Sequence, residues 1–168
     1  ILGWVCLVSG CVPVEPEPPE PNRPPHIDSD RVTPAGQVTR LGDAEDPDIE
    51  LSVDVLLDPS REDTLYYAWY SSAQGAGRFS FSQVSRIGSP SGRDDPFFRF
   101  QGVSKTIDAC DVIGQANSQQ TETIWLFVTD REFQRLTPDS FRLQEGAYVA
   151  SWSWVLEYSP GLSNQCGQ

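Results

Sequence analysis

The chain is predicted to be an all-β protein built from two antiparallel sheets packed face to face. From about Ile27 onward, short runs of aromatic and β-branched residues are separated by Gly, Pro, Asn and Asp. Apolar and polar residues alternate within several of these runs, as in strands with one buried face. The apolar spacing of three and four residues that is typical of helices is not sustained anywhere. About seven short strands between turn signals therefore favour a β-sandwich.

Six segments carry the strand pattern most clearly. Residues 49–55 alternate apolar with polar side chains until Asp58-Pro59-Ser60 interrupts the pattern. Residues 123–128 are the most apolar run of the domain. The expected strands are 49–55, 65–70, 78–84, 97–107, 123–128 and 148–156.

The segment from Asp58 to Tyr70, DPSREDTLYYAWY, joins an acidic turn to an aromatic strand. It resembles the passage from the second to the third strand of immunoglobulin-like and PKD-like modules, where a tryptophan of the third strand lies in the core. The resemblance implies an immunoglobulin-like antiparallel β-sandwich in which Trp69 takes that position. The disulfide between the sheets of antibody domains is not expected, because no cysteine lies near either central strand.

The chain is strongly acidic, since 24 Asp and Glu residues against 12 Lys and Arg give a formal net charge of −12. Such a charge repels phosphate backbones and anionic lipid headgroups, whose binding depends on Lys and Arg. We therefore expect no nucleic-acid partner. Solubility accounts for the acidic excess, and a divalent cation or a basic partner is the alternative.

The amino-terminal residues are typical of an export signal. Residues 1–8 are apolar and uncharged, and Val8-Ser9-Gly10-Cys11 closes this segment. The segment ends after about a dozen residues, short of the ~20 that a membrane-spanning helix needs.

The four residues Val8-Ser9-Gly10-Cys11 resemble the lipobox of bacterial lipoproteins, an aliphatic residue and two small ones before a cysteine. The resemblance implies cleavage between Gly10 and Cys11 and lipidation of the Cys11 thiol with diacylglycerol. The lipid would anchor the chain in a membrane with its domain extracytoplasmic. Val12 follows the cysteine, and by the same resemblance this favours the outer membrane or the cell surface.

A proline-rich stretch comes next. Seven of the 14 residues at 12–25 are proline, which fixes φ and removes an amide donor. We expect a disordered, extended polyproline II tether of ~40 Å, at about 3.1 Å per residue. The sequence thus divides into the end of a signal peptide at 1–10, a lipidated cysteine with its linker at 11–26, and an immunoglobulin-like domain at 27–168.

Cys110 and Cys166 remain once Cys6 is assigned to the signal and Cys11 to the lipid. In an exported chain two such cysteines usually pair, so we expect a structural disulfide between them. A zinc site and a catalytic thiol are not expected, because His26 is the single histidine and falls in the tether. The same reason argues against catalysis of the Ser-His-Asp or Cys-His kind.

Acidic residues crowd two turns, an arrangement that suits calcium. Thr129-Asp130-Arg131-Glu132 is also similar to an acidic motif that helps to bind calcium between cadherin repeats. Solvated turn acids are the other interpretation, since the sequence shows no tandem repeat and no EF-hand spacing. The candidate ligands are Asp43, Glu45, Asp46, Asp48, Asp58, Glu62 and Asp63.

Trp125, Trp152 and Trp154 are candidates for an aromatic platform that binds glycan. Trp152 and Trp154 are two residues apart, so they point to the same face of their strand. Packing in the core is the alternative role of these side chains.

The leading hypothesis is a non-enzymatic, membrane-anchored extracytoplasmic lipoprotein that acts as a structural or protein-interaction module. No cofactor is expected. The expected partners are a membrane, reached through the lipid anchor, and another envelope or surface protein. A calcium- or carbohydrate-binding adhesion module is the alternative, and hydrolysis by a pair of carboxylates is a third hypothesis.

The folded mature protein is expected to present no reactive thiol at Cys110. Pairing with Cys166 would close a loop of about 57 residues and stabilise the fold by roughly 4 kcal/mol. Maleimide labelling before and after reduction, read by mass spectrometry, measures this. Modification of Cys110 without reductant would contradict the pairing.

Overall fold

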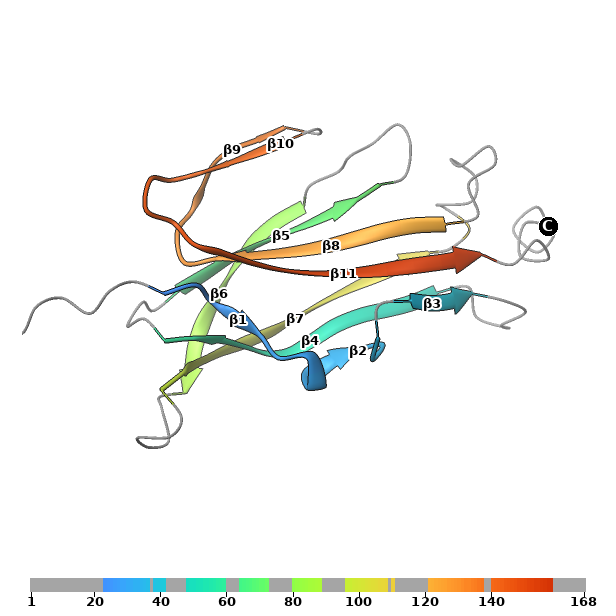
Figure 1. The fold of residues 1–168 in the computed structure, drawn as a ribbon, viewed down its shortest axis with the longest axis horizontal. Helices are drawn as coiled ribbons and strands as arrows, with labels where there is room; N and C mark the ends of the chain where they lie inside the picture. Colours follow the sequence, from blue (N-terminus) through green and yellow to red (C-terminus); the bar gives the residue numbers. More distant parts are fainter. Residues whose placement is uncertain are drawn as a thin grey trace, which may run out of the picture.

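A computed structural model of the chain describes residues 23–36, 38–41, 48–59, 64–72, 80–88, 96–108, 110, 121–137 and 140–158. These residues are predominantly strands, so the all-β prediction is confirmed (Figure 1). The elements are β1 (His26–Ile27), the 3-10 helix η1 (Ser29–Arg31), β2 (Val32–Thr33), β3 (Val38–Leu41), β4 (Asp48–Asp58), β5 (Thr64–Ser71), β6 (Ser80–Gly88), β7 (Phe98–Asp108), β8 (Thr121–Thr129), β9 (Phe133–Thr137), β10 (Ser140–Leu143) and β11 (Val149–Tyr158).

The six strands expected from the sequence correspond to β4, β5, β6, β7, β8 and β11. The short strands β1, β2 and β3 and the hairpin of β9 and β10 were not expected. Strands of two to five residues carry too few alternations to be recognised, because their conformation depends on the neighbouring strand with which they pair.

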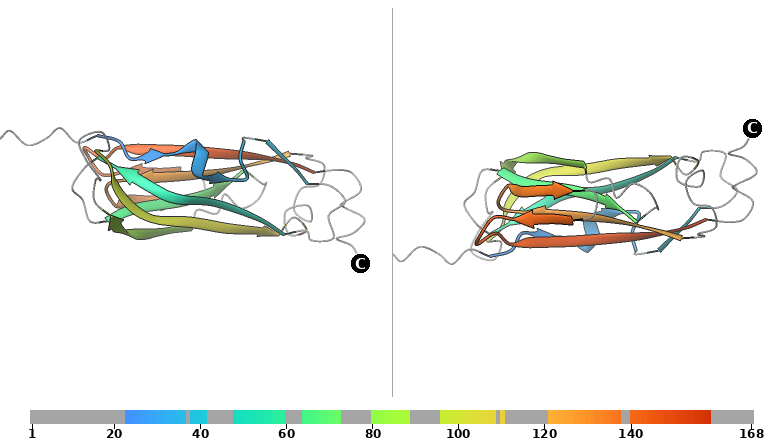
Figure 2. Two further views of the ribbon diagram at one scale, coloured as in Figure 1. Left: turned by 90° about the horizontal axis from the view of Figure 1, so that it is seen from below. Right: turned by 90° about the horizontal axis from the view of Figure 1, so that it is seen from above.

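Nine strands form one curled sheet in the order β1-β4-β7-β6-β5-β8-β11-β3, and β2 also pairs with β4. The pairing of β11 with β3 is parallel, and the other described pairings are antiparallel. Strand β6 pairs with both β5 and β7, so it joins two layers at one edge. One layer holds β1, β2, β4 and β7, and the other holds β5, β8, β11 and β3 (Figure 2). The structure is therefore an all-β sandwich whose two layers belong to one curled, mainly antiparallel sheet.

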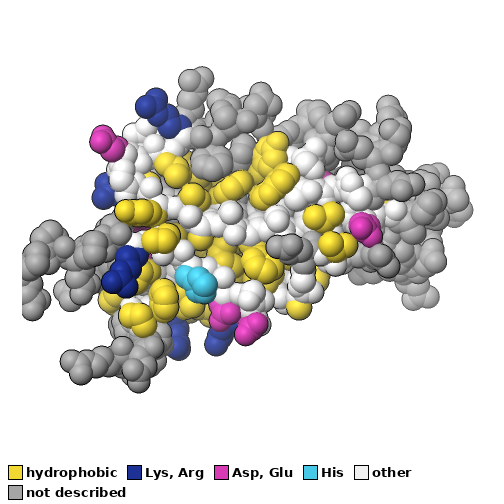
Figure 3. Space-filling model, in the orientation of Figure 1, with side chains coloured by type: hydrophobic (Ala, Val, Ile, Leu, Met, Phe, Trp, Pro, Cys, Tyr) yellow, Lys and Arg dark blue, Asp and Glu magenta, His cyan; other side chains and the backbone are white. Residues whose placement is uncertain are grey.

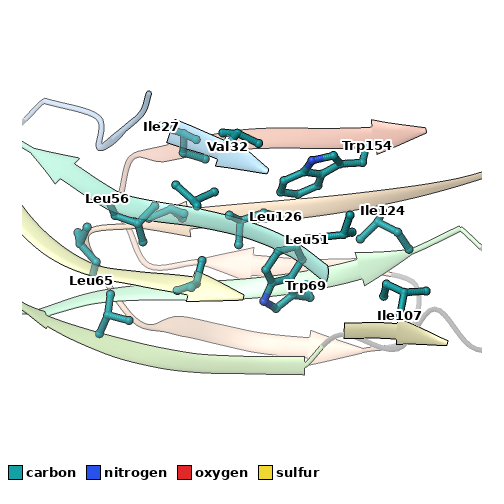
Figure 4. Close-up of a cluster of buried hydrophobic side chains, with 14 of the residues drawn as sticks. Ile27, Val32, Leu51, Leu56, Leu65, Trp69, Ile107, Ile124, Leu126 and Trp154 are labelled. Atoms are coloured by element: carbon teal, nitrogen blue, oxygen red, sulfur yellow. The ribbon is translucent and has the colours of Figure 1, made fainter. Parts of the chain in front are cut away.

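A stacked tryptophan pair lies at the centre of the core. Trp69 of β5 and Trp154 of β11 are buried, with ring centroids 5.6 Å apart and an interplanar angle of 27°. Both rings point between the layers, toward side chains such as Leu51 of β4 (Figure 4). Trp154 Nε1 donates a hydrogen bond of 3.4 Å to the Pro34 carbonyl oxygen. The predicted core position of Trp69 is therefore confirmed.

Strands β4 and β7 change their buried faces at the same point. On β4 the buried residues are Leu51 and Val53, and then Leu56, so Val55 leaves the core face that the sequence alternation predicts. On β7 the change falls between Phe100 and Val103, the partners of Leu56 and Val53. The buried face thus changes at the same place on both strands. Side chains of opposite parity therefore point into the core on the two sides of this place.

His26 belongs to the sheet and not to the tether, which corrects its assignment from the sequence. It lies in β1 opposite Leu57 of β4 and is exposed. Its ring stacks on Phe97 at a centroid distance of 5.8 Å. Pairing with β4 draws the chain into the sheet one residue before the expected start of the domain.

Apolar and charged side chains are separated on the surface shown in Figure 3. Hydrophobic side chains gather along the middle of the molecule in that view, and charged ones lie mainly toward its margins. Among the described residues, no helix is long and apolar enough to cross a membrane.

Gly102 permits β7 to approach β4 closely where the two strands change their buried faces. A Cβ atom at position 102 would lie 2.2 Å from the Asp54 carbonyl oxygen, closer than real Cβ contacts allow. We expect Gly102→Ala to lower the free energy of unfolding by about 3 kcal/mol, since the backbone must shift.

Gly88→Ala is the matched control. A Cβ atom there would meet Arg99 Cβ at 3.5 Å, an ordinary contact. Its unfolding free energy is expected to change by about 1 kcal/mol at most. Urea denaturation of both variants measures the difference, and equal stability of the two would refute the role of Gly102.

Candidate functional site

The residues of the lipid anchor lie outside the described residues. This applies to Val8, Ser9, Gly10 and Cys11, so cleavage and lipidation stay predictions. Cys110 lies just beyond β7, where its backbone N–H donates a hydrogen bond of 2.8 Å to Asp108 Oδ1. Cys166 is not among the described residues, so the disulfide also stays a prediction.

The calcium candidates do not form one site where the structure describes them. Asp48 is exposed at the start of β4 and Asp58 is fully buried at its end, about 33 Å further along the strand. Within the described ranges, no three potential ligand side chains gather around a common point. Asp43, Glu45, Asp46, Glu62 and Asp63 lie outside these ranges.

The motif Thr129-Asp130-Arg131-Glu132 holds the base of the β9–β10 hairpin. Asp130 is buried, and its Oδ1 accepts hydrogen bonds from the Tyr148 backbone N–H at 2.9 Å and from Thr129 Oγ1 at 3.5 Å. Arg131 Nη1 donates to the Glu145 carbonyl oxygen at 3.5 Å. These bonds join the two chain segments that enter and leave the hairpin, so they have a structural role.

The three tryptophans proposed as a platform do not share a face. Trp154 is fully buried, and Trp152 packs against the core beside it, with ring centroids 6.4 Å apart. Trp125 occupies the opposite face of its strand, because its neighbours Ile124 and Leu126 are buried. The two-residue spacing of Trp152 and Trp154 therefore marks the core, whereas Trp125 lies on the outside.

The outer face of β5, β8 and β11 is aromatic and almost uncharged. We call the outward residues Tyr66, Tyr70, Trp125 and Phe127 the aromatic patch. Each of these side chains is half-buried. Tyr70 and Trp125 are cross-strand partners with ring centroids 5.3 Å apart and an interplanar angle of 42°. The other described outward residues of these strands are Thr64, Ala68, Thr121, Thr123, Thr129, Val149, Ser151, Ser153, Val155 and Glu157.

Ala68 shows how the rings lie on this face. It points outward, yet it is fully buried. Tyr66 and Tyr70 flank it on β5, and Phe127 is its partner on β8. An outward alanine becomes inaccessible only when larger neighbours close over it, so this part of the face is covered by side chains.

The β9–β10 hairpin lies over one end of the outer face. Figures 1 and 2 both place it above β5 and β8, on the side away from β4 and β7. Phe133 of β9 is buried there. The Tyr70–Trp125 pair lies about 13 Å along β8 from Thr129, where the chain leaves toward the hairpin.

A second polar cluster is enclosed at the other end of the sandwich. Glu122 of β8 is buried, and its Oε2 accepts a hydrogen bond of 2.8 Å from the Tyr158 hydroxyl. Its Oε1 accepts a hydrogen bond from Ser71 Oγ of β5. One carboxylate thus joins β5, β8 and β11 and satisfies two hydroxyl donors.

The pKa values of two groups near Glu122 are shifted. Burial raises the pKa of Tyr158 well above its usual range, and the charge of Glu122 and its hydrogen bond act in the same direction. Burial lowers the pKa of Lys105, and the charge of Glu122 opposes part of that change. Both carboxylate oxygens of Glu122 accept hydrogen bonds from side chains of the fold, so the cluster has a structural role.

Comparisons with known protein families, with curated proteins and with solved structures found no match. Among the described residues, the aromatic patch and the Glu122 cluster are the two candidate sites. Sequence reasoning found Trp125 but missed Tyr70, Ser71, Glu122 and Tyr158. Glu122 lies two residues before Ile124 and so on the same face of the strand, which was the available signal for the cluster. The expected strand began at Thr123 and left Glu122 out.

Tyr158 is expected to stay protonated where exposed tyrosines ionise, around pH 10. The unfolded chain loses this proton above about pH 10 while the folded chain keeps it, so stability falls as pH rises from there. Tyrosinate absorbance and the unfolding free energy, both followed against pH, measure the two effects.

Tyr158→Phe should leave the absorbance step near pH 10 unchanged and weaken the alkaline loss of stability. Tyr148→Phe is the control, because it removes a phenol hydroxyl outside the Glu122 cluster from a side chain that is 44% exposed. A smaller step in Tyr158→Phe would show that Tyr158 ionises normally.

Proposed function

We propose that this chain is a non-enzymatic lipoprotein of the bacterial envelope, whose immunoglobulin-like domain works by binding another envelope or surface component. The lipid on Cys11 would fix it at the outer membrane or cell surface, and the proline-rich stretch would hold the domain away from the lipid. The observation that carries the binding role is the almost uncharged aromatic outer face of β5, β8 and β11 in a chain of net charge −12.

The described polar groups support a binding role over catalysis. Asp130 and Glu122 are buried and hydrogen-bonded to groups of the fold itself. His26 is exposed and stacked on Phe97, in a different layer from Glu122. A general base must reach the proton that it removes and a nucleophile beside it, and these residues do not meet in such an arrangement.

The outer face has the composition that favours association. Interfaces are enriched in Tyr and Trp and depleted of charge at their centres, because rigid rings bury much area at a small loss of entropy. Glu157 is the one charged residue among the described outward positions of β5, β8 and β11, and it lies near the end of β11. The other described acidic residues therefore do not lie among the outward positions that a partner on this face would contact.

The tether would attach to one end of the domain. The described chain enters β1 at the end of the sandwich that also carries the base of the β9–β10 hairpin (Figure 1). The end that holds Glu122 and Cys110 lies at the opposite end of the long axis. With the tether attached before β1, the Glu122 end would be the end of the domain farther from the tether.

The calcium-binding alternative has less support. The two described candidates, Asp48 and Asp58, lie at opposite ends of β4, and Asp130 serves the hairpin base. A hard cation needs six or more oxygen ligands around one point.

Cys11→Ser is expected to convert the membrane-bound protein into a form released from the membrane fraction, because the thioether can no longer form. Cys6→Ser is the matched control, since it changes a cysteine of the same segment outside the lipobox. Mass spectrometry of the membrane-extracted protein should show acyl chains on an amino-terminal Cys11. An unmodified Cys11 in that protein would sink the anchor proposal.

A further inference from the structure

We propose that the outer face of β5, β8 and β11 binds a neutral polysaccharide chain, with Trp125 and Tyr70 as its stacking surface. The inference rests on the proposed function and names the chemical class of the partner. It departs from the platform suggested by the sequence, because Trp152 and Trp154 face the core and Tyr70 takes their place beside Trp125.

The paired rings provide the apolar part of the site. Trp125 and Tyr70 lie side by side on neighbouring strands, 5.3 Å apart, and each keeps part of its surface exposed. A pyranose ring carries C–H groups on its faces, and these pack against the electron-rich face of an aromatic ring. Two adjacent rings on rigid strands offer such a surface to successive sugars without reorganisation.

Hydroxyl side chains lie directly beside these rings. Ser153 of β11 is the cross-strand partner of Trp125, and Ser151 is the partner of Phe127. Thr123 is the next outward residue along β8. Serine is small, so a ligand stacked on Trp125 has room above β11, and each hydroxyl both donates and accepts hydrogen bonds. This matches the hydroxyl-bearing edge of a sugar ring.

Charge selects a neutral ligand. The net charge of −12 repels acidic polymers such as uronic-acid polysaccharides and phosphate-rich chains. The described outward side chains of β5, β8 and β11 place no cation on the face to overcome this repulsion. Glu157, the single acid among them, lies four positions from Ser153, so it does not create a site for a cationic polymer at Trp125.

The hairpin gives the site one raised side. Strands β9 and β10 stand above the part of the outer face near Thr129, and the hydrogen bonds of Asp130 and Arg131 hold their base (Figures 1 and 2). The Tyr70–Trp125 pair lies about 13 Å beyond Thr129 along β8. A chain on this pair would therefore lie close to the hairpin and across the strands.

Affinity electrophoresis of the full chain tests the proposal. The protein in non-ionic detergent is run in native gels that contain xylan, galactomannan or mixed-linkage β-glucan, with alginate as the acidic polymer. We expect at least one neutral polysaccharide to retard the protein and alginate to have no effect. Trp125→Ala should weaken the retarding interaction about tenfold, the value of one aromatic stacking contact.

Two further variants separate binding from folding. Ser153→Asp keeps both rings and adds a charge beside them, so it should also reduce retardation by the neutral polymer. Tyr148→Ala removes a ring that is 44% exposed outside the aromatic patch, so it should bind like the parent chain. Thermal unfolding followed by circular dichroism checks that the fold of each variant is as stable as that of the parent chain.

Three results would overturn the proposal: no retardation by any of the neutral polymers, equal retardation of Trp125→Ala and the parent chain, or concentration-dependent self-association that Trp125→Ala abolishes. The last result would assign the face to a second copy of the chain. Gel retardation does not depend on the lipid, so an unmodified Cys11 would remove the anchor and leave this test intact.

Discussion

The stacking of Trp69 on Trp154 is the contact around which the rest of the domain is arranged. The two side chains come from β5 and β11, on either side of β8, and their rings fill the space between the layers. Trp154 also donates to the Pro34 carbonyl oxygen, which ties the segment between β2 and β3 to the core. Removing either ring would leave a cavity larger than any neighbouring side chain could fill.

The period-two geometry of strands then decides what is left outside. On β11 and β8, each residue committed to the core places its neighbours on the opposite face, so the burial of Trp154 exposes Ser153 and the burial of Ile124 and Leu126 exposes Trp125. The aromatic patch is therefore built on strands that the core holds rigid. A rigid surface loses little entropy on binding, and this supports the binding role that we propose.

Buried polar groups hold the two ends of the sandwich. Asp130 accepts from Tyr148 N–H and holds the base of the hairpin, whereas Glu122 accepts from the Tyr158 and Ser71 hydroxyls at the far end. Buried carboxylates are tolerated when hydrogen bonds replace their hydration. The fold itself therefore engages both of these acids.

The all-β class, the six longer strands and the core position of Trp69 could be predicted from the sequence, because alternation and turn residues are local signals. The lipobox and tether are local motifs too, and they remain predictions. Three features could not be predicted: the contact of Trp125 with Tyr70, the hydrogen bonds of Glu122 with Ser71 and Tyr158, and the change of buried face on β4 opposite Gly102. Each of these depends on which strands become neighbours and in what register, and a period of two residues specifies the face of a strand but not its partner.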